Sequence, residues 1–593
     1  MALSGRSARV STDTYNHLLL IVAGLGGLLY GIDVGIIAGA LPYLNDTSGL
    51  NAAQLSFVVA AVLLGSVIST LFAGALSDWI GRRQLMRWSG LLFIVSIPVI
   101  ALAHGYAPLV FGRLLQGLSA GFIGVVVPLY LAECLGADER GKGTGVFQWL
   151  LTLGIVVAAI VGLYFSHRVS QIADLHDAAR LFAFKDEAWR RIFWVSMPPG
   201  LLFFAGTFFV AESPRWLFRR GNAEAALTAL LRSRSKTQAE IELHEMKEAA
   251  EAESAKSGAK AAKESLLQRK YLVPFALACL ILACNQTTGV NSIIAYNATV
   301  LIQAGLNDNQ AHLAYVVFTV VNFLVTIAGM MLVDRKGRKF LLSVGSAGIV
   351  VSLLCVGARF LKTEKLRLDY RSVVQSVVSS DQTLRLEFDQ NSARKILNSD
   401  GREGSAIKNG PTSLTIIYSY GDFRAATSAT RSDDLAAKPI TIARADCVPA
   451  NRVEAFFSDP FANLQTARTA PLTIDNALIT PVPDARSGWL TAAFLFAFMA
   501  SFAIGPGVCV WLALSELMPT RIRSNGMSVA LLINQAVSTF IAAIFLPTVG
   551  KYGYATVFFA FAGCTVIYFF TAAFLLPETK GKTLEEIEKY FEG

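Results

Sequence analysis

The chain has 593 residues, of which 53% are hydrophobic and 16% are charged, and its formal net charge is +9. A soluble globular protein carries about 25% charged residues, so this composition excludes the soluble class and indicates an integral membrane protein. The positive charge does not indicate nucleic-acid binding, because Lys and Arg cluster in short loops beside apolar segments, as in membrane proteins.

Twelve apolar segments, each near the ~20 residues that a membrane span requires, are separated mostly by short polar loops. They lie at about 16–41, 53–76, 85–104, 107–133, 143–165, 190–211, 271–303, 310–333, 340–361, 488–515, 524–548 and 553–576. The charged sequence DWIGRR at 78–83 follows the second segment and returns as DRKGRK at 334–339 after the eighth. Such a repeat indicates two related halves. We therefore predict an all-α membrane protein with twelve transmembrane helices in two pseudo-symmetric six-helix bundles, at residues 1–213 and 271–593.

Glycine-rich stretches suggest how some of these helices pack. GLGGLLYG at 24–31 lies in the first apolar segment, and GLSAGFIG at 117–124 lies in the fourth. Small residues let helix backbones approach closely in lipid. We therefore expect close helix packing at both stretches.

Basic residues in the short loops indicate the orientation of the chain. They follow the second, fourth, eighth and tenth apolar segments, and include Arg82, Arg140, Arg338 and Arg523. Positively charged loops face the cytoplasm. We therefore expect these loops and both termini on the cytoplasmic side of the cell membrane.

The stretch between the halves, residues 214–270, is rich in Ala, Glu and Lys. This composition predicts short surface helices, and we interpret the stretch as a cytoplasmic helical linker rather than a separate catalytic domain.

A second polar stretch, at about 362–487, interrupts the second half between the ninth and tenth segments and is expected outside the membrane, on the extracytoplasmic side. Residues that favour strands gather at 384–388, 413–420 and 439–445. They predict a small sheet-rich module, with a long disordered loop as the alternative. A loop of this length is unusual without a role, so a ligand or an unknown extracytoplasmic partner of this insert stays open.

The seven cysteines have neither the pattern of a disulfide framework nor convincing metal spacing. No HExxH motif, nucleophile elbow or phosphate loop is present, so we expect neither an enzyme nor a bound metal or cofactor.

Several motifs in chain order resemble the sugar porter family of the major facilitator superfamily. They are GRLLQGLSAGF and PLYLAE within 112–133, AESPRWLF at 211–218, NQTTGVNSIIAY at 285–296, GPGVCVWLALSELMPTRIR at 505–523 and PETKGKTLEEIE at 577–588. The likeness covers every part of the chain except the insert, whose length resembles that of proton-coupled myo-inositol transporters. The resemblance implies a midplane sugar site that opens alternately to the two sides of the membrane.

Asp33 is the only acidic residue well inside an apolar segment of the first half. A charged carboxylate there is costly unless it is paired or functional, and Arg113 lies at a similar depth. Burial and a nearby base act on a carboxyl in opposite directions, which can poise it to bind and release a proton. By resemblance, an acid at this position couples sugar transport to protons. The alternative is a static buried ion pair.

A set of amides on several segments forms the expected substrate site. They are Gln148, Gln286, Asn291, Asn322 and Asn534. Amides both donate and accept hydrogen bonds, so they can bind sugar hydroxyls without a buried charge. By resemblance each matches a sugar-contacting position, and the alternative is hydrogen bonding between helices. Departures from the family pattern at Asn285, Ala295 and Gln535 leave the identity of the sugar open.

Trp511 follows GPGVCV, whose Gly and Pro residues are expected to break the tenth span. Broken helices line transporter cavities, and an aromatic ring there offers an apolar face to a sugar. An ordinary packing or interfacial tryptophan is the alternative.

A set of charged residues maps to the cytoplasmic ends of the spans. They are Asp78, Arg82, Arg83, Glu133, Arg140, Glu212, Arg215, Asp334, Arg338, Glu516, Arg523 and Glu578. The resemblance implies gating charges that form ion pairs between the two halves and separate during transport. Simple anchoring of the basic residues at the cytoplasmic surface is the alternative.

The sequence therefore predicts proton-coupled symport of a monosaccharide (hexose or pentose) or of myo-inositol, driven by a proton gradient, by a protein whose partners are the sugar or polyol, protons and the lipid bilayer. A facilitative sugar uniporter is the first alternative. A transporter-like sugar sensor is the second, although a sensor would need a long cytoplasmic tail after the last apolar segment.

Overall fold

The computed structural model describes residues 12–135, 140–258, 268–398, 410–434, 439–452, 455, 459, 461–518, 523–580, 587 and 590–591; within these ranges, the side chains of residues 140–144, 249–258, 334, 511–515 and 523–525 are left out of the description.

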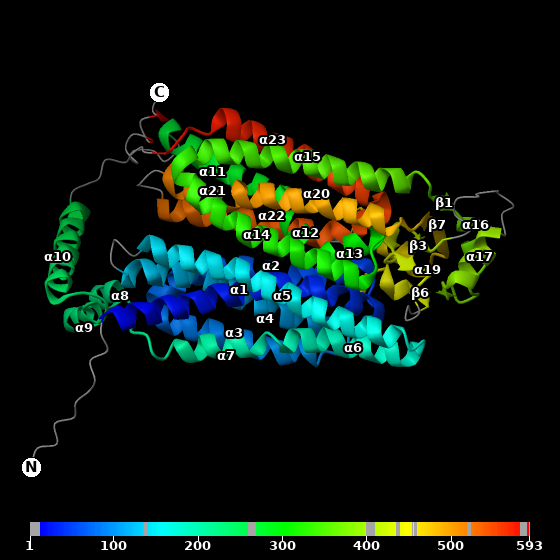
Figure 1. Ribbon diagram of the computed structural model, residues 1–593, viewed down its shortest axis with the longest axis horizontal. Helices are drawn as coiled ribbons and strands as arrows, with labels where there is room; N and C mark the ends of the chain where they lie inside the picture. Colours follow the sequence, from blue (N-terminus) through cyan, green and yellow to red (C-terminus); the bar gives the residue numbers. More distant parts are fainter. Residues whose placement is uncertain are drawn as a thin grey trace, which may run out of the picture.

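Two bundles of long helices lie side by side and parallel to the long axis of the molecule (Figure 1). The first bundle, the N half, contains α1 (Thr12–Ser48), α2 (Ala52–Ile80), α3 (Arg82–Ala101), α4 (Tyr106–Cys134), α5 (Arg140–Ala173), α6 (Ala178–Trp194) and α7 (Met197–Gly206). The second bundle, the C half, contains α11 (Arg269–Thr287), α12 (Val290–Ala295), α13 (Asn297–Gln303), α14 (Asp308–Lys336), α15 (Arg338–Glu364), α20 (Ala485–Ile504), α21 (Pro506–Leu517), α22 (Arg523–Tyr552), α23 (Tyr554–Phe570) and a short π-helix, Thr571–Leu575. The predicted two-bundle architecture is confirmed.

Eleven stretches of the described residues are long and apolar enough to cross a membrane. The predicted segment 190–211 is not among them, because it is divided between α6 and α7. Pro198 and Pro199 lie in the first turn of α7, and proline cannot donate the backbone hydrogen bond that would continue α6. The two helices run one after the other along α3, so together they occupy the place of the predicted sixth span (Figure 1).

Small residues bring neighbouring helices into backbone contact. A Cβ atom on Gly31 of α1 would overlap the carbonyl oxygen of Leu151 on α5, and one on Gly117 of α4 would overlap that of Val62 on α2. The close packing expected at both glycine-rich stretches is therefore confirmed.

The repeated charged loops have the same backbone conformation in the two halves. Gly81 ends α2 with φ +97°, and Gly337 ends α14 with φ +88°. Residues with a side chain rarely adopt this conformation, so the glycine in each copy lets the chain reverse directly into the next helix. The starts of α2 and α14 also match, because Asn51 and Asn307 each cap their helix in a capping box with a glutamine.

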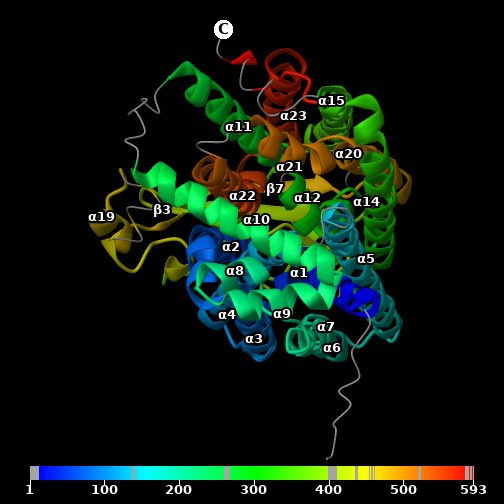
Figure 2. The same ribbon diagram turned by 90° about the vertical axis from the view of Figure 1, so that its left-hand side faces the viewer.

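Three linker helices cover one end of the bundle, which we call the linker end. They are α8 (Pro214–Arg219), α9 (Ala223–Ser233) and α10 (Lys236–Gly258). Seen from this end, α10 crosses in front of the long helices (Figure 2). The described part of the linker is helical, as its composition predicts.

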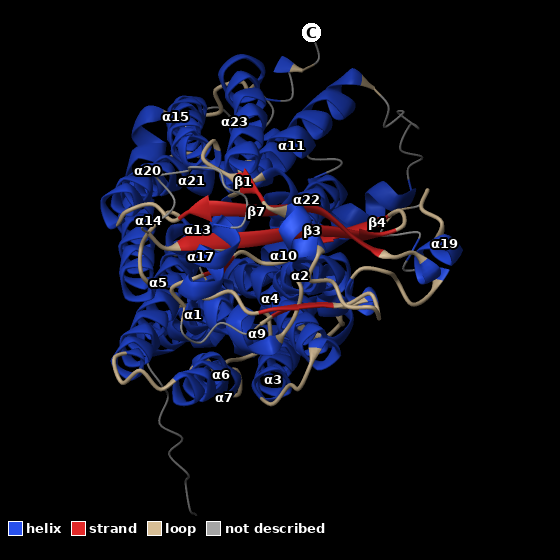
Figure 3. Cartoon of the chain, turned by 90° about the vertical axis from the view of Figure 1, so that its right-hand side faces the viewer, coloured by secondary structure: helices blue, strands red, loops and turns tan. Residues whose placement is uncertain are grey.

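The opposite end, which we call the insert end, carries the segment between α15 and α20, residues 365–484, which we call the insert (Figure 3). Its elements are β1 (Leu368–Asp369), α16 (Arg371–Gln375), β2 (Leu384–Leu386), α17 (Gln390–Asn398), β3 (Thr412–Tyr420), β4 (Phe423–Ala426), β5 (Thr430–Arg431), β6 (Ile440–Ile442), a 3-10 turn at Arg444–Asp446, α19 (Leu464–Thr469) and β7 (Leu472–Pro481). One antiparallel sheet has the order β1-β7-β3-β4, with β5 also paired to β3, and β2 pairs with β6. The three predicted strand regions became β2, β3 and β6, so the described insert is a folded module rather than a disordered loop.

Buried apolar side chains show how the halves are joined. At the linker end each half has its own core, one around Leu85 and Tyr130 and the other around Leu282 and Cys509. At the insert end a single core, which includes Ile36 and Tyr315, combines side chains from both halves. The two bundles are therefore packed against each other at the insert end.

Candidate transport site

Asp33 on α1 and Arg113 on α4 form a buried pair inside the N half. Oδ1 of Asp33 lies 3.8 Å from Nη1 of Arg113, and the two side chains are 1% and 2% exposed. Arg113 also donates to Oε1 of Gln116 at 2.6 Å. Among the described residues, neither carboxylate oxygen of Asp33 has a hydrogen-bond partner. Asp33 is thus a buried carboxyl close to the base Arg113, and both of its oxygens are available to accept a hydrogen bond or a proton.

The three amides of α11, α12 and α22 form one hydrogen-bonded cluster in the C half. Gln286 donates to Oδ1 of Asn534 at 3.1 Å and accepts from Asn291 at 2.9 Å. Asn291 also donates to Oγ of Ser538 at 2.7 Å. The break between α11 and α12, at Gly289, lies between the two amides of that segment. Gln286 contacts Asn534, and Asn291 contacts Ser538, which lies one helical turn further along α22.

A tyrosine connects the surroundings of Asp33 to this amide cluster. Tyr30 lies one helical turn before Asp33 on α1, and its side chain lies beside that of Gln535 of α22, the neighbour of Asn534 in the chain. Gln535 also donates to Oγ of Ser66 on α2 at 3.4 Å. The carboxyl and the amides therefore lie on helices that contact each other across the two halves.

The remaining predicted substrate residues lie on α5, α14 and α21. Asn322 on α14 is buried, and its Oδ1 accepts from Thr326 at 3.5 Å. Gln148 on α5 is half-buried. The side chain of Trp511 lies outside the description, and its backbone belongs to α21, which begins at Pro506 after a break at Gly505, as the sequence predicts.

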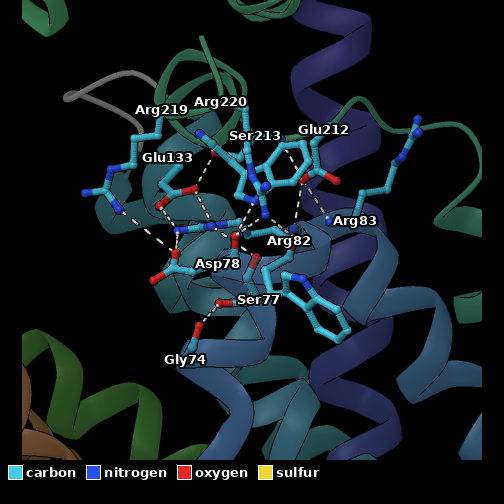
Figure 4. Close-up of polar contacts among 12 residues, drawn as sticks. Gly74, Ser77, Asp78, Arg82, Arg83, Glu133, Glu212, Ser213, Arg219 and Arg220 are labelled. Carbon is cyan, nitrogen blue, oxygen red and sulfur yellow. Dashed lines mark hydrogen bonds and ion pairs between the residues drawn. The ribbon is translucent and has the colours of Figure 1, made fainter. Parts of the chain in front are cut away.

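At the linker end of the N half, a buried arginine organises the charged residues (Figure 4). Nη2 of Arg82 lies 2.7 Å from Oδ1 of Asp78, and it donates to Oε1 of Glu133 at 3.1 Å. The other oxygen of Glu133 accepts from the hydroxyl of Ser213. Glu212 caps α3, because its Oε1 accepts the backbone N–H groups of Arg82 and Arg83 at 2.9 and 3.0 Å.

The C half repeats this arrangement with different residues. Nη2 of Arg338 lies 3.1 Å from Oε1 of Glu516. Oε2 of Glu516 accepts from the hydroxyl of Thr579 at 2.6 Å. Glu578 caps α15 by accepting the backbone N–H groups of Arg338 and Lys339 at 3.1 and 3.3 Å. The internal symmetry predicted from the charged loops therefore extends to a network that joins three separate parts of each half.

The ion pairs expected between the two halves stay a prediction. Among the described residues, every ion pair of the predicted gating charges joins residues of the same half or of the adjoining linker. Arg215 is exposed on α8 and has no ion pair with a described side chain. The side chains of Arg140, Asp334 and Arg523 lie outside the description. Glu212 and Glu578 accept backbone N–H groups at the start of a neighbouring helix instead of forming ion pairs with described side chains.

Ser213 and Thr579 are members of these networks that the sequence analysis missed. Each follows directly after the capping glutamate of its half, Glu212 or Glu578. An alignment of the two halves on these glutamates would have revealed them.

At the insert end, polar contacts join the halves directly. Oδ2 of Asp308 on α14 accepts from the hydroxyls of Tyr43 on α1 and Ser166 on α5, both at 2.7 Å. The hydroxyl of Tyr315 donates to the carbonyl oxygen of Gly35 at 3.1 Å. Together with the shared apolar core, these contacts close the bundle at the insert end.

Curated proteins of known name match most of the chain. It is 26% identical over 595 residues to the human proton myo-inositol cotransporter, covering 98% of this chain and 83% of that protein. It is 24% identical over 576 residues to the arabinose-proton symporter of Bacillus subtilis, covering 96% and 94%. It is also 33% identical over 339 residues to the glucose transporter GlcP of Staphylococcus epidermidis, covering 57% and 70%.

Among solved structures, the partially occluded inward-open xylose transporter XylE from E. coli aligns with a TM-score of 0.63 at 20% identity, over 96% of this chain and all of that one. The fold is therefore that of the major facilitator superfamily. The model of the family described as "Sugar (and other) transporter" matches residues 19–378 and 473–591, and it leaves out the middle of the insert. The chain is thus a multi-pass membrane protein and not an enzyme, and it belongs to the sugar transporter family.

Proposed function

We propose that this sugar transporter is a proton-coupled symporter of a monosaccharide or a cyclic polyol. The observation that carries the proposal is the buried Asp33–Arg113 pair, in which the carboxyl lacks a hydrogen-bond partner among the described residues. A carboxyl that only stabilised the fold would be expected to have its oxygens satisfied. Two relatives, the proton myo-inositol cotransporter and the arabinose-proton symporter, support the same function.

In this proposal the amide cluster binds the sugar and Asp33 carries the proton. The cluster of Gln286, Asn291 and Asn534 offers donors and acceptors to hydroxyl groups, and Gln148, Asn322 and Trp511 are the further residues assigned to the sugar. Tyr30 and Gln535 connect the two sites. A proton that crosses a potential of 100 mV supplies ~2.3 kcal/mol, enough for about 50-fold accumulation of the sugar.

We place the linker end in the cytoplasm, because the repeated basic loops lie there, and the insert end outside the cell. The halves then meet at the outer side, and the charged networks of each half lie at the inner side. In the outward-open state the halves would separate at the insert end and meet at the linker end, where Asp78, Arg82, Glu133, Arg338 and Glu516 act as gating charges.

The test is uptake of labelled glucose, xylose, galactose and myo-inositol into proteoliposomes, with and without an inward proton gradient. Wild type is expected to accumulate one substrate only when the gradient is present, and Asp33→Asn to exchange that substrate without accumulating it. Asp186→Asn, which removes a carboxylate from the partly exposed Asp186–Arg190 pair of α6, is the matched control. Equal behaviour of wild type and Asp33→Asn without accumulation would instead identify a uniporter.

A further inference from the structure

One short loop of the insert, Arg431 to Asp434, contacts both halves. Arg431 ends β5, and its Nη1 donates to the carbonyl oxygens of Ile302 at 2.9 Å and Leu306 at 3.3 Å. These carbonyls belong to α13 and to the loop before α14. Arg431 therefore fixes this loop to the C half.

Three residues further on, Asp434 binds the N half. Nζ of Lys185 on α6 donates to Oδ1 and Oδ2 of Asp434 at 2.9 and 3.1 Å, and to Oδ2 of Asp46 on α1 at 2.7 Å. The Lys185 side chain is only 9% exposed. One lysine of the N half is thus held between a carboxylate of its own half and a carboxylate of the insert.

The charge of Lys185 is maintained by these two acids. Burial lowers the pKa of the amine, but Asp46 and Asp434 act in the opposite direction and more strongly, so the pKa of Lys185 is raised. The side chain therefore stays positively charged at physiological pH. Removing a partner from a buried charge costs far more than separating an exposed pair.

A second contact and a cavity lie beside this lysine. Nδ2 of Asn51, at the start of α2, donates to the carbonyl oxygen of Asp446 in the insert at 2.9 Å. A cavity of about 500 Å³ lies beneath the insert, lined by residues of the N half, the C half and the insert, such as Asn51, Thr299 and Thr415. The insert therefore covers the position at which the two halves meet.

We propose that the Lys185–Asp434 ion pair is a releasable latch that holds the insert end closed, and that the insert acts as a cover of this end of the transport path. The inference rests on the proposed function, because alternating access requires the halves to separate here. The insert is joined to the C half by the chain and by Arg431, so Asp434 has to leave Lys185 when the end opens.

The test follows opening without using transport. Thr299, on the cavity wall in α13, is replaced by cysteine, and the rate of its reaction with a bulky maleimide is measured for full-length protein in nanodiscs, with the unsubstituted protein as background. Asp434→Asn and Lys185→Gln are each expected to raise this rate at least five-fold.

Two controls separate the latch from a general effect of charge. Asp46→Asn removes the acid of the same half and leaves the bridge between the halves, so the reaction is expected to stay slow. Arg191→Gln removes a cation from an exposed pair on the same helix and is expected to change nothing. Equal rates in wild type, Asp434→Asn and Lys185→Gln would overturn the latch. Acceleration by Arg431→Gln but by neither of these two variants would also overturn it, because the loop would then separate from the C half and not from Lys185.

The outcomes also distinguish this inference from the proposed function. If the variants open faster but none of the four sugars moves, the latch stands and the symporter proposal fails. If sugar accumulates normally and the cysteine reacts at one rate in all variants, the symporter stands and the latch fails.

Discussion

The hydroxyl of Tyr43 lies 2.7 Å from Oδ2 of Asp308, and this contact joins the first helix of the N half to α14 of the C half. Both residues lie at the insert end, where the halves share one apolar core. Hydrogen bonds to a charged group contribute about 1.5–3 kcal/mol, and opening of this end has to break this one. In the proposed transport cycle, the contact therefore favours the state in which the insert end is closed.

Tyr43→Phe is expected to open the insert end about ten-fold more often, since ~1.4 kcal/mol corresponds to a factor of ten. The measurement is the reaction rate of cysteine at position 299 with a maleimide. Tyr164→Phe, at an exposed tyrosine of α5, is the control. An unchanged rate in Tyr43→Phe would show that the hydrogen bond does not limit opening.

The capping glutamates predict matched losses of stability in the two halves. Glu212→Gln and Glu578→Gln remove the charge that accepts the first backbone N–H groups of α3 and α15. Each substitution is expected to cost about 1–2 kcal/mol, measured as a lower midpoint of thermal unfolding in detergent. Glu187→Gln, in an exposed pair on α6, is the control. A loss in only one half would contradict the structural equivalence of the two networks.

Close helix contact predicts a large effect of a single methyl group. Gly31→Ala places a Cβ against the carbonyl oxygen of Leu151, whereas the same change at Gly74 meets nothing within 4 Å. Forced overpacking costs about 1–3 kcal/mol or more, so Gly31→Ala is expected to lower the unfolding midpoint clearly and Gly74→Ala hardly at all. Similar midpoints for the two variants would mean that α1 and α5 can move apart easily.

The amide cluster predicts a specific loss of substrate affinity. In Gln286→Ala, Asn291 and Asn534 each lose a hydrogen-bond partner, and a bound sugar would lose one as well. KM for uptake is expected to rise about ten-fold, the equivalent of one hydrogen bond. Gln465→Ala, at an exposed glutamine of the insert, is expected to leave KM unchanged. An unaltered KM in Gln286→Ala would place the sugar elsewhere.

The pKa of Asp433 predicts how the attachment of the insert to the C half depends on pH, because Asp433 binds Arg431, which contacts the C half. Burial raises the pKa of this carboxyl, but its bonds with Arg431 lower it more, so the folded-state pKa lies below the ordinary value. The stabilisation is therefore complete above the unfolded-state pKa of about 3.9 and is lost as the pH falls through the lower folded-state value.

Hydrogen exchange of peptides that contain β5, corrected for intrinsic rates, is expected to show weaker protection at about pH 3 than at about pH 6. Asp433→Asn should reduce protection at the higher pH and remove most of the pH dependence. Glu387→Gln, at an exposed acid of the insert, should behave as wild type. Equal protection of wild type at both values would mean that the Arg431–Asp433 bonds do not hold the insert in place.

The sequence predicted the features that depend on short stretches of chain. Apolar length predicts the spans, the repeated charged loop predicts the two halves, and an acid and a base at similar depth predict the Asp33–Arg113 pair. The strands at 384–388, 413–420 and 439–445 could be predicted from their residue types. β7 was missed, because Asp475 and Asn476 interrupt its apolar pattern.

Other features depend on which distant groups meet. Glu212 could face another charge or the start of α3, and only the fold places two backbone N–H groups beside it. Lys185 and Asp434 are 249 residues apart, and both lie in polar stretches with many charges. No local pattern distinguishes them from their neighbours.

The first and last strands of the insert lie next to each other, because Leu368 of β1 is paired with Ile479 of β7. The chain thus leaves α15 and returns to α20 at nearly the same place, and the insert has a core of its own. A segment with adjoining ends can be gained, lost or exchanged in evolution without displacing the helices that flank it. The insert is in this sense a cassette, and it could be moved as a unit into a related transporter that lacks it.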